Sequence, residues 1–292
     1  MAEYEITHTT EYNYSENVSH CQNIAYLLPQ SDARQTCEKT EITILPQPAI
    51  SADHTDYYGN RFLYFAVEQP HQQLSVTAKT RVRTYTAGAV NEENSLPWDI
   101  LAQNLRNPTE AFDIAAVEYL LPSPFAPLSE AFAEYAAASF SPNRPVLAAA
   151  LDLVQRIRKD FKYEQKSTTI LTPLAEVFRL RRGVCQDFAH LAIAALRSMG
   201  IPARYVSGYI ETYPPPGKPK LRGSDASHAW ISVYAGNGCW YDYDPTNGKA
   251  ITEEFIVTAR GRDFGDVSPL KGILFGGGKH SLKVAVDVHR IA

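Results

Sequence analysis

The sequence predicts an α+β protein in which an antiparallel β domain precedes a core of helices and strands. Three observations support this fold class. Large or apolar side chains occupy the even positions of residues 4–14, which is the period of a half-buried strand. A helical stripe of apolar residues follows Cys185. Strand-like runs then return at residues 204–210, 228–234 and 240–244.

Length and composition restrict the class of protein. At 292 residues the chain is long enough for two domains, at ~150 residues each. A formal net charge of −4 gives no reason to expect nucleic acid or an anionic membrane as partner. No run approaches the ~20 apolar residues that span a bilayer, and no signal peptide is visible at the start. The four cysteines form no paired framework, so we expect a reducing compartment and a cytoplasmic protein.

The N-terminal β domain is predicted to cover residues 1–88. Turn residues, including Pro29 and the Gly59-Asn60 pair, separate its strands. We find no chemical motif in this domain. After residues 4–14, its strand-like runs fall at residues 24–28, 42–45, 62–67 and 74–85.

The remainder divides into a connector at residues 89–145 and a core at residues 146–292. The connector is rich in alanine and proline, yet it holds too many aromatic and leucine side chains to stay solvated, so we expect it to pack on the core as a mostly helical segment. A proline-rich loop at residues 213–219 is expected to be stiff and exposed beside a cleft. Alternating apolar residues from Leu282 to Val288 predict a last strand, which we assign to the core.

Cys185 lies where a loop turns into a helix. The apolar stripe of this helix ends before Gly200 and Pro202, which are stop signals. A cysteine in the first turn faces unpaired backbone N–H groups and the positive end of the helix dipole. Both favour the thiolate over the thiol, which is the form that acts as a nucleophile.

A thiolate that attacks an amide needs a base, and the base needs a group to orient it. His228 begins one strand, and the next strand returns after a loop at residues 236–238. In this hairpin Trp230 faces Asp244, and His228 is the diagonal neighbour of Asp244 on the same sheet face. Diagonal neighbours lie ~7–8 Å apart by Cα, within reach of an imidazole. A slip of one residue would place the two on opposite faces.

Three segments together resemble the transglutaminase-like superfamily. They are Gly-Val-Cys-Gln-Asp-Phe at 183–188, Ser-His-Ala-Trp at 227–230 and Asp-Pro-Thr-Asn-Gly at 244–248. The chain is similar, more narrowly, to the bacterial transglutaminase-like cysteine proteases with an accessory N-terminal β domain. Phrases at residues 8–14, 56–61 and 261–269 extend this resemblance over nearly the whole chain.

The resemblance implies a papain-like core, in which the helix of the nucleophile packs on an antiparallel sheet. It implies Cys185 as nucleophile, His228 as general base and acid, and Asp244 as the carboxylate that orients His228. The backbone N–H of Cys185 is expected in the oxyanion hole. Further candidates for oxyanion or substrate contacts are Tyr163, Gln186 and Trp230. No acidic cluster matches a calcium site, and we expect no metal and no cofactor.

Neighbouring residues have simpler interpretations. His190 follows Cys185 by five helical positions, which places it on another face, so a packed histidine is expected rather than a second base. Asp187 is typical of an acid in the first turn of a helix. Asp242 shares the parity of Asp244 and competes for its role, and Cys239 is expected to be a small core residue. A zinc site from the Cys and His side chains lacks any recognised spacing.

The predicted function is cleavage or exchange of an amide bond through a thioester on Cys185. A peptide or protein amide is the expected substrate, and hydrolysis by water is favoured over attack by an amine. Two alternatives remain open. One is a non-catalytic scaffold or peptide-binding module, which requires His228 to be remote from Cys185. The other is an acyltransferase with the same three residues. The sequence indicates no oligomeric state.

Overall fold

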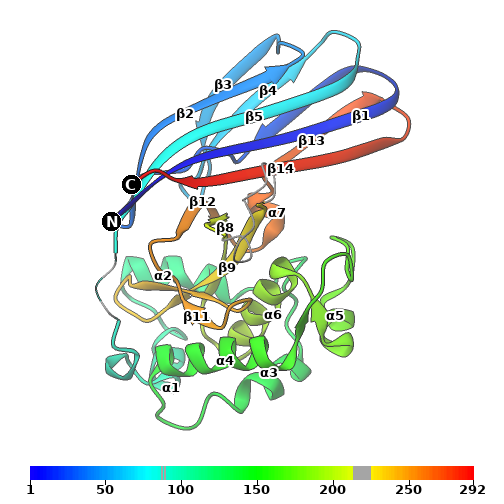
Figure 1. The fold of residues 1–292 in the computed structure, drawn as a ribbon. Helices are drawn as coiled ribbons and strands as arrows, with labels where there is room; N and C mark the ends of the chain where they lie inside the picture. Colours follow the sequence, from blue (N-terminus) through cyan, green and yellow to red (C-terminus); the bar gives the residue numbers. More distant parts are fainter. Residues whose placement is uncertain (87, 89, 213–224) are drawn as a thin grey trace, which may run out of the picture.

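The structure is a computed structural model that describes residues 1–86, 88, 90–212 and 225–292. The predicted loop at residues 213–219 lies outside this part of the chain. A long, twisted β sheet lies on one side of the molecule, and a smaller sheet with most of the helices lies on the other (Figure 1). The predicted α+β fold class is therefore confirmed.

The larger sheet is organised around its first strand. β1 is long enough to pair with two strands on each side: β5 and β14 along its first half, β4 and β13 along its second. The alternation at residues 4–14 matches this position, because Tyr4 and Ile6 are buried on one face while Glu5 is exposed. The strands of this sheet are β1 (Ala2–Ala25), β2 (Gln35–Leu45), β3 (Ile50–Thr55), β4 (Arg61–Val67), β5 (His71–Thr84), β13 (Leu270–Gly276) and β14 (His280–Arg290).

The C-terminal strands correct one expectation from the sequence. We assigned the last strand to the core, whereas β13 and β14 leave the core and pair antiparallel with β1 in the N-terminal sheet. Figure 1 shows the two chain ends side by side as a result. The alternation of Leu282 to Val288 predicts a strand, but it carries no information about the strand's partner. The boundaries at residues 88 and 145 stay predictions.

The core surrounds one helix, α6 (Cys185–Ser198), which is almost wholly buried. α3 and α4 cover one side of it and the smaller sheet covers the other, in the order β11-β10-β9-β8-β12. The helices are α1 (Trp98–Asn104), α2 (Ala111–Val117), α3 (Glu130–Ala137), α4 (Val146–Asp160), α5 (Leu174–Leu180) and α7 (Phe264–Val267), with short 3-10 turns at Glu92–Asn94 and Glu118–Leu120. The strands are β6 (Lys162–Tyr163), β7 (Arg182–Gly183), β8 (Ala203–Ile210), β9 (Ser227–Tyr234), β10 (Trp240–Asp244), β11 (Lys249–Ala250) and β12 (Phe255–Gly261).

Side-chain amides of the β domain join the two sheets. The Gln35 amide donates to the carbonyl of Val257 at 2.9 Å and accepts from its N–H at 2.8 Å. Asn60 makes the same pair of bonds with the backbone of Arg260. These amides act as a substitute strand along β12, the last strand of the smaller sheet. The β domain is thereby held firmly against the core, which fixes the geometry of the space between them.

Candidate active site

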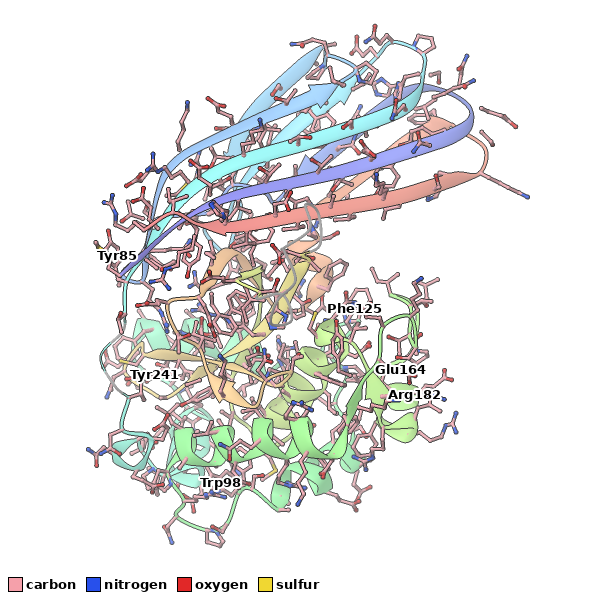
Figure 2. All side chains as sticks on the ribbon, in the orientation of Figure 1. Tyr85, Trp98, Phe125, Glu164, Arg182 and Tyr241 are labelled. Atoms are coloured by element: carbon pink, nitrogen blue, oxygen red, sulfur yellow. The ribbon has the colours of Figure 1, made fainter. Side chains whose placement is uncertain are left out.

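Cys185 is the first residue of α6, and only Val184 separates it from the short strand β7. β7 pairs with β6, and Arg182 and Glu164 beside it form an ion pair with a nitrogen–oxygen distance of 3.5 Å. Figure 2 labels both residues on the side of the core near α5. The backbone before Cys185 is therefore fixed by a strand on one side and begins a buried helix on the other.

Asp187 caps this helix. Its carboxylate accepts the N–H of Val184 at 2.8 Å and the hydroxyl of Thr168 at 2.6 Å. Burial raises the pKa of Asp187, and these two hydrogen bonds act in the opposite direction. Gly183 makes the close approach possible, because a Cβ at this position would lie 2.7 Å from a carboxylate oxygen of Asp187. The first-turn acid expected from the sequence is thus a specific cap that positions the backbone of Cys185.

The predicted hairpin register is confirmed. Tyr234 faces Trp240, and Ile231 faces Tyr243. This register brings Nε2 of His228 to 2.8 Å from Oδ2 of Asp244. Asp244 is fully buried, and its carboxylate also accepts the N–H of Thr246 at 2.8 Å and the side-chain amide of Asn247. The carboxylate is therefore held by several donors, and it fixes the orientation of the imidazole.

The electrostatics of His228 follow from these contacts. Burial by itself lowers the pKa of the imidazole, but hydrogen bonds with Asp244 and Cys185 and the charges of both residues raise it to about 10. Burial raises the pKa of Asp244, yet the bond from His228, its charge and the Asn247 amide outweigh burial and lower it. With Nε2 on Asp244, the other ring nitrogen is left for the Cys185 thiol. His228 thus lies between Asp244, to which it is bonded at 2.8 Å, and Cys185, which lines the same cavity and contributes to the raised pKa of His228.

Two further residues of the same hairpin, Trp230 and Asp242, lie beside the pair formed by His228 and Asp244. Trp230 is fully buried, stacks beside His228 with ring centroids 6.1 Å apart, and donates its indole N–H to Asp242 at 3.3 Å. From the sequence we expected Trp230 as an oxyanion or substrate residue; in the structure it is buried and is not among the residues that line the cavity at Cys185. Asp242 is occupied by Trp230, so Asp244 alone of the two aspartates pairs with His228.

His190 and Cys239 take no part in the contact between His228 and Asp244. As expected, His190 is a packed histidine: it stacks on Tyr205 with centroids 4.9 Å apart, and its Nε2 accepts the N–H of Phe264 at 3.2 Å. Burial lowers the pKa of His190 to about 3. The expectation for Cys239 was wrong. It is exposed beside the hairpin loop, one residue before β10 begins.

A cavity of about 240 Å³ opens at Cys185 and His228. Gln186, a candidate from the sequence, lines it, whereas Tyr163 does not. Tyr163 is nevertheless close enough for the charge of Cys185 to add to the effect of burial in raising its pKa. On the core side, the lining continues through Tyr205, Ser207, Ser227, Ala229, Phe264, Ser268 and Pro269.

The opposite wall of the cavity comes from the β domain, which sequence reasoning left without a chemical role. Strands β1 and β14 contribute His8, Thr10, Tyr12, Leu282 and Val284. The even-position alternation of both strands places these side chains on one sheet face, but only the fold reveals that this face covers Cys185. The large sheet lies directly above the core in Figure 1, and Figure 2 labels Phe125 on the side of the core nearest that sheet.

His8 is a titratable side chain in this wall that sequence reasoning missed as a site residue. Its Nδ1 lies 2.9 Å from the hydroxyl of Tyr209, and its Nε2 lies 3.2 Å from the hydroxyl of Thr10. Burial lowers the pKa of His8 to about 4, so it is neutral at physiological pH. Its contacts tie β1 to β8 across the two domains. Within the described ranges, no group of three or more His, Cys, Asp or Glu side chains is placed to hold a metal ion.

Comparisons with known proteins agree with this geometry. Residues 4–83 match the model of the bacterial transglutaminase-like N-terminal region, and residues 133–245 match that of the transglutaminase-like superfamily. An uncharacterised Mycobacterium tuberculosis protein is 41% identical over 98% of this chain and 92% of its own length. An uncharacterised Mycobacterium leprae protein is 35% identical over 98% of both chains.

One solved structure shares the whole fold. It is a Cytophaga hutchinsonii protein, provisionally described as a cysteine protease, and its crystal structure covers 100% of this chain and 91% of its own. The two structures align with a TM-score of 0.77 at 21% sequence identity. Among the described residues, no helix is both long and apolar enough to cross a membrane.

Proposed function

Because this chain belongs to the transglutaminase-like superfamily, we propose that it cleaves amide bonds with Cys185, His228 and Asp244 as its catalytic residues. The observation that carries the proposal is the 2.8 Å bond between His228 and the buried carboxylate of Asp244, beside a Cys185 that lines the same cavity and raises the pKa of His228. Cysteine hydrolases need this order of nucleophile, base and orienting acid. Cys185 and His228 also border a cavity, so that an amide can reach the sulfur.

The first chemical step transfers the acyl group to sulfur. A pKa of about 10 keeps His228 protonated at neutral pH, which favours the thiolate of Cys185 beside it. The thiolate attacks the amide carbon, and the carbonyl electron pair moves onto oxygen. As the C–N bond breaks, the leaving amine takes the proton of His228. A thioester on Cys185 and a neutral imidazole remain.

The second step releases the acid. Neutral His228 takes a proton from water as the water oxygen attacks the thioester carbon. Collapse of this intermediate expels the Cys185 thiolate, gives a carboxylic acid and restores the imidazolium. An amine in place of water would give a new amide instead. We favour water, because a cavity of this size readily admits it and needs no second binding site for an amine.

The negative charge on the substrate oxygen needs donors. The backbone N–H of Cys185 is one, since the first residue of a helix has no intrahelical acceptor. For the second we propose the side-chain amide of Gln186, which lines the cavity next to Cys185. The half-exposed Tyr163 is the remaining candidate.

The scaffold alternative loses its main support. It requires a His228 that is remote from Cys185, whereas a hydrogen bond with Cys185 contributes to the raised pKa of His228.

The proposal of a reducing, cytoplasmic location rests on the four cysteines, all of which are free. Fractionation of the source cell tests the location: recovery of the protein outside the cytoplasm would overturn it.

Selective alkylation tests the proposed nucleophile. At mildly acidic pH, iodoacetamide should label Cys185 faster than Cys239, although Cys239 is the more exposed thiol. Cys239 donates to the carbonyl of Asn237 and serves as the internal control. Peptide mass spectrometry resolves the two sites in one sample. Equal rates, or faster labelling of Cys239, would overturn the proposed role of Cys185.

A further inference from the structure

The apolar face of β14 is covered along one half and open along the other. Val286 and Val288 are 0% and 1% exposed, and they pack with Tyr209 and Ile256 of the core. Val284 and Leu282 continue the same face but are 48% and 54% exposed. The packing of the core against β14 ends where the cavity of Cys185 begins, since Val284 and Leu282 line that cavity.

The backbone edge of β14 changes in the same place. β14 bonds to β1 along one edge, and on the other edge Asp225 donates its N–H to the carbonyl of Val286 at 3.0 Å. Backbone groups of a strand alternate in direction, so the N–H and C=O of Val284 and Leu282 point the same way as those of Val286. In the part of the chain that the structure describes, no segment pairs with this edge at residues 282–284.

The chain itself leaves this edge just before the site. After Asp225 it turns into β9, whose first two residues, Ser227 and His228, both line the cavity. A pairing already formed at Val286 therefore ends at the entrance to the site, and the open part of the edge continues along the cavity.

We propose that the substrate is an extended peptide that pairs as an added strand with β14 at residues 282–284. This inference rests on the proposed function, because it places the peptide beside Cys185. Only a peptide backbone supplies N–H and C=O groups at the spacing that a strand edge offers. The cavity of about 240 Å³ is below the ~300–1,000 Å³ of typical ligand pockets, so it holds only part of the substrate and the rest lies along this edge.

The same pairing predicts a side-chain preference. In a strand pair, directly opposite residues project to the same face of the sheet. Substrate residues opposite Val284 and Leu282 therefore face the cavity wall formed by Tyr12, Val284 and Leu282, which is largely apolar. Apolar substrate residues are favoured at these positions, and charged residues are disfavoured because they lose their hydration there.

A proline scan of the edge tests the proposal on the full chain. Val284→Pro removes the N–H that points to the open edge and leaves the bonds to β1 in place. The probe is a tryptic digest of unfolded casein, with cleavage followed by mass spectrometry. We expect kcat/KM for the cleaved peptides to fall about tenfold or more in Val284→Pro, and less in Val284→Ala, which keeps its N–H. The control Lys283→Ala, whose exposed side chain points to the other face, should cleave like the wild type.

A substrate scan keeps the test independent of how the proline variant folds. Backbone N-methylation of a cleaved peptide, one position at a time, should lower wild-type cleavage at alternate positions on one side of the scissile bond. Uniform tolerance of N-methyl groups, or unchanged cleavage by a folded Val284→Pro variant, would overturn the added strand. Alkylation of Cys185 by iodoacetamide separates this proposal from the proposed function. If Cys185 is alkylated selectively but no peptide is cleaved, only the peptide proposal fails. If Cys185 is not alkylated selectively, the proposed function fails first.

Discussion

Nε2 of His228 lies 2.8 Å from Oδ2 of Asp244, across two neighbouring strands of the smaller sheet. Asp244 has no exposed surface, and it receives three further hydrogen bonds from Thr246 and Asn247. A carboxylate that is buried and fully bonded stays charged, and it keeps one ring nitrogen of His228 occupied. The other nitrogen is thereby directed to Cys185, which makes this contact the geometric basis of the predictions that follow.

Replacement of Asp244 should shift the pH profile of activity. The carboxylate is among the causes that raise the pKa of His228 to about 10, so the alkaline limb of kcat/KM in the wild type should lie near that pH. In Asp244→Asn the negative charge is lost, and the limb should move toward lower pH. The rate at neutral pH should fall by roughly 10²–10⁴-fold, because the imidazole loses its orientation. An unshifted limb would show that Asp244 does not act on His228.

The stability of the protein should depend on His228 at alkaline pH. The pKa of His228 is about 10 in the folded state against 6.5 in the unfolded chain. A raised folded pKa contributes stability that is complete below pH 6.5 and is lost as the pH rises to about 10. The difference in unfolding free energy between wild type and His228→Gln should therefore shrink over this interval, by at most about 1.4 kcal/mol per pH unit. Urea titrations at several pH values measure it, and parallel curves for the two proteins would contradict the prediction.

The cap on α6 should matter for both folding and reactivity. Asp187→Ala removes the acceptor for the N–H of Val184 and for the Thr168 hydroxyl, and it should lower the free energy of unfolding by about 1–2 kcal/mol. Alkylation of Cys185 should slow in the same variant, because the backbone that positions the thiol is released. Asp187→Asn keeps an acceptor and is the matched control, with a smaller loss expected. Full stability of Asp187→Ala in urea titration would argue against the cap.

The amide of Gln35 should stabilise the junction of the two sheets. Gln35→Ala leaves the buried N–H and C=O of Val257 without a partner, and the expected loss of unfolding free energy is about 2–4 kcal/mol. The exposed Gln72 of β5 provides the control, since Gln72→Ala should change stability by no more than ~0.5 kcal/mol. Similar losses in both variants, compared by urea titration, would mean that the bonds to Val257 contribute nothing specific.

The sequence was informative wherever a pattern is local. The apolar stripe after Cys185 predicts α6, and the three-residue loop at 236–238 predicts the register that joins His228 to Asp244. Both depend on spacing along a single helix or hairpin. The parity of Asp242 left that residue as a rival of Asp244, which its Asp-Pro-Thr motif favoured; the bond of Asp244 to His228 and the contact of Asp242 with Trp230 distinguish the two.

The sequence did not predict which distant segments of the chain pair with one another. The alternation in residues 282–288 predicts a strand but not its pairing with β1, and the wall of the cavity follows from that pairing. The exposure of Cys239 does not follow from strand parity, because this residue lies beside the hairpin loop, one residue before β10 begins. The β domain lacks chemical motifs because its contribution is a surface and a strand edge, both made by the fold rather than by particular reactive side chains.

The central claim is that Cys185 is the acylated nucleophile, and trapping the acyl-enzyme tests it most directly. Wild-type protein is mixed briefly with p-nitrophenyl acetate, quenched in acid and digested for peptide mass spectrometry. We predict one acetyl group on the peptide that contains Cys185, and none on that peptide in Cys185→Ala. An acetyl group on Cys239 or on lysines, with Cys185 unmodified, would contradict the assignment of Cys185 as the nucleophile.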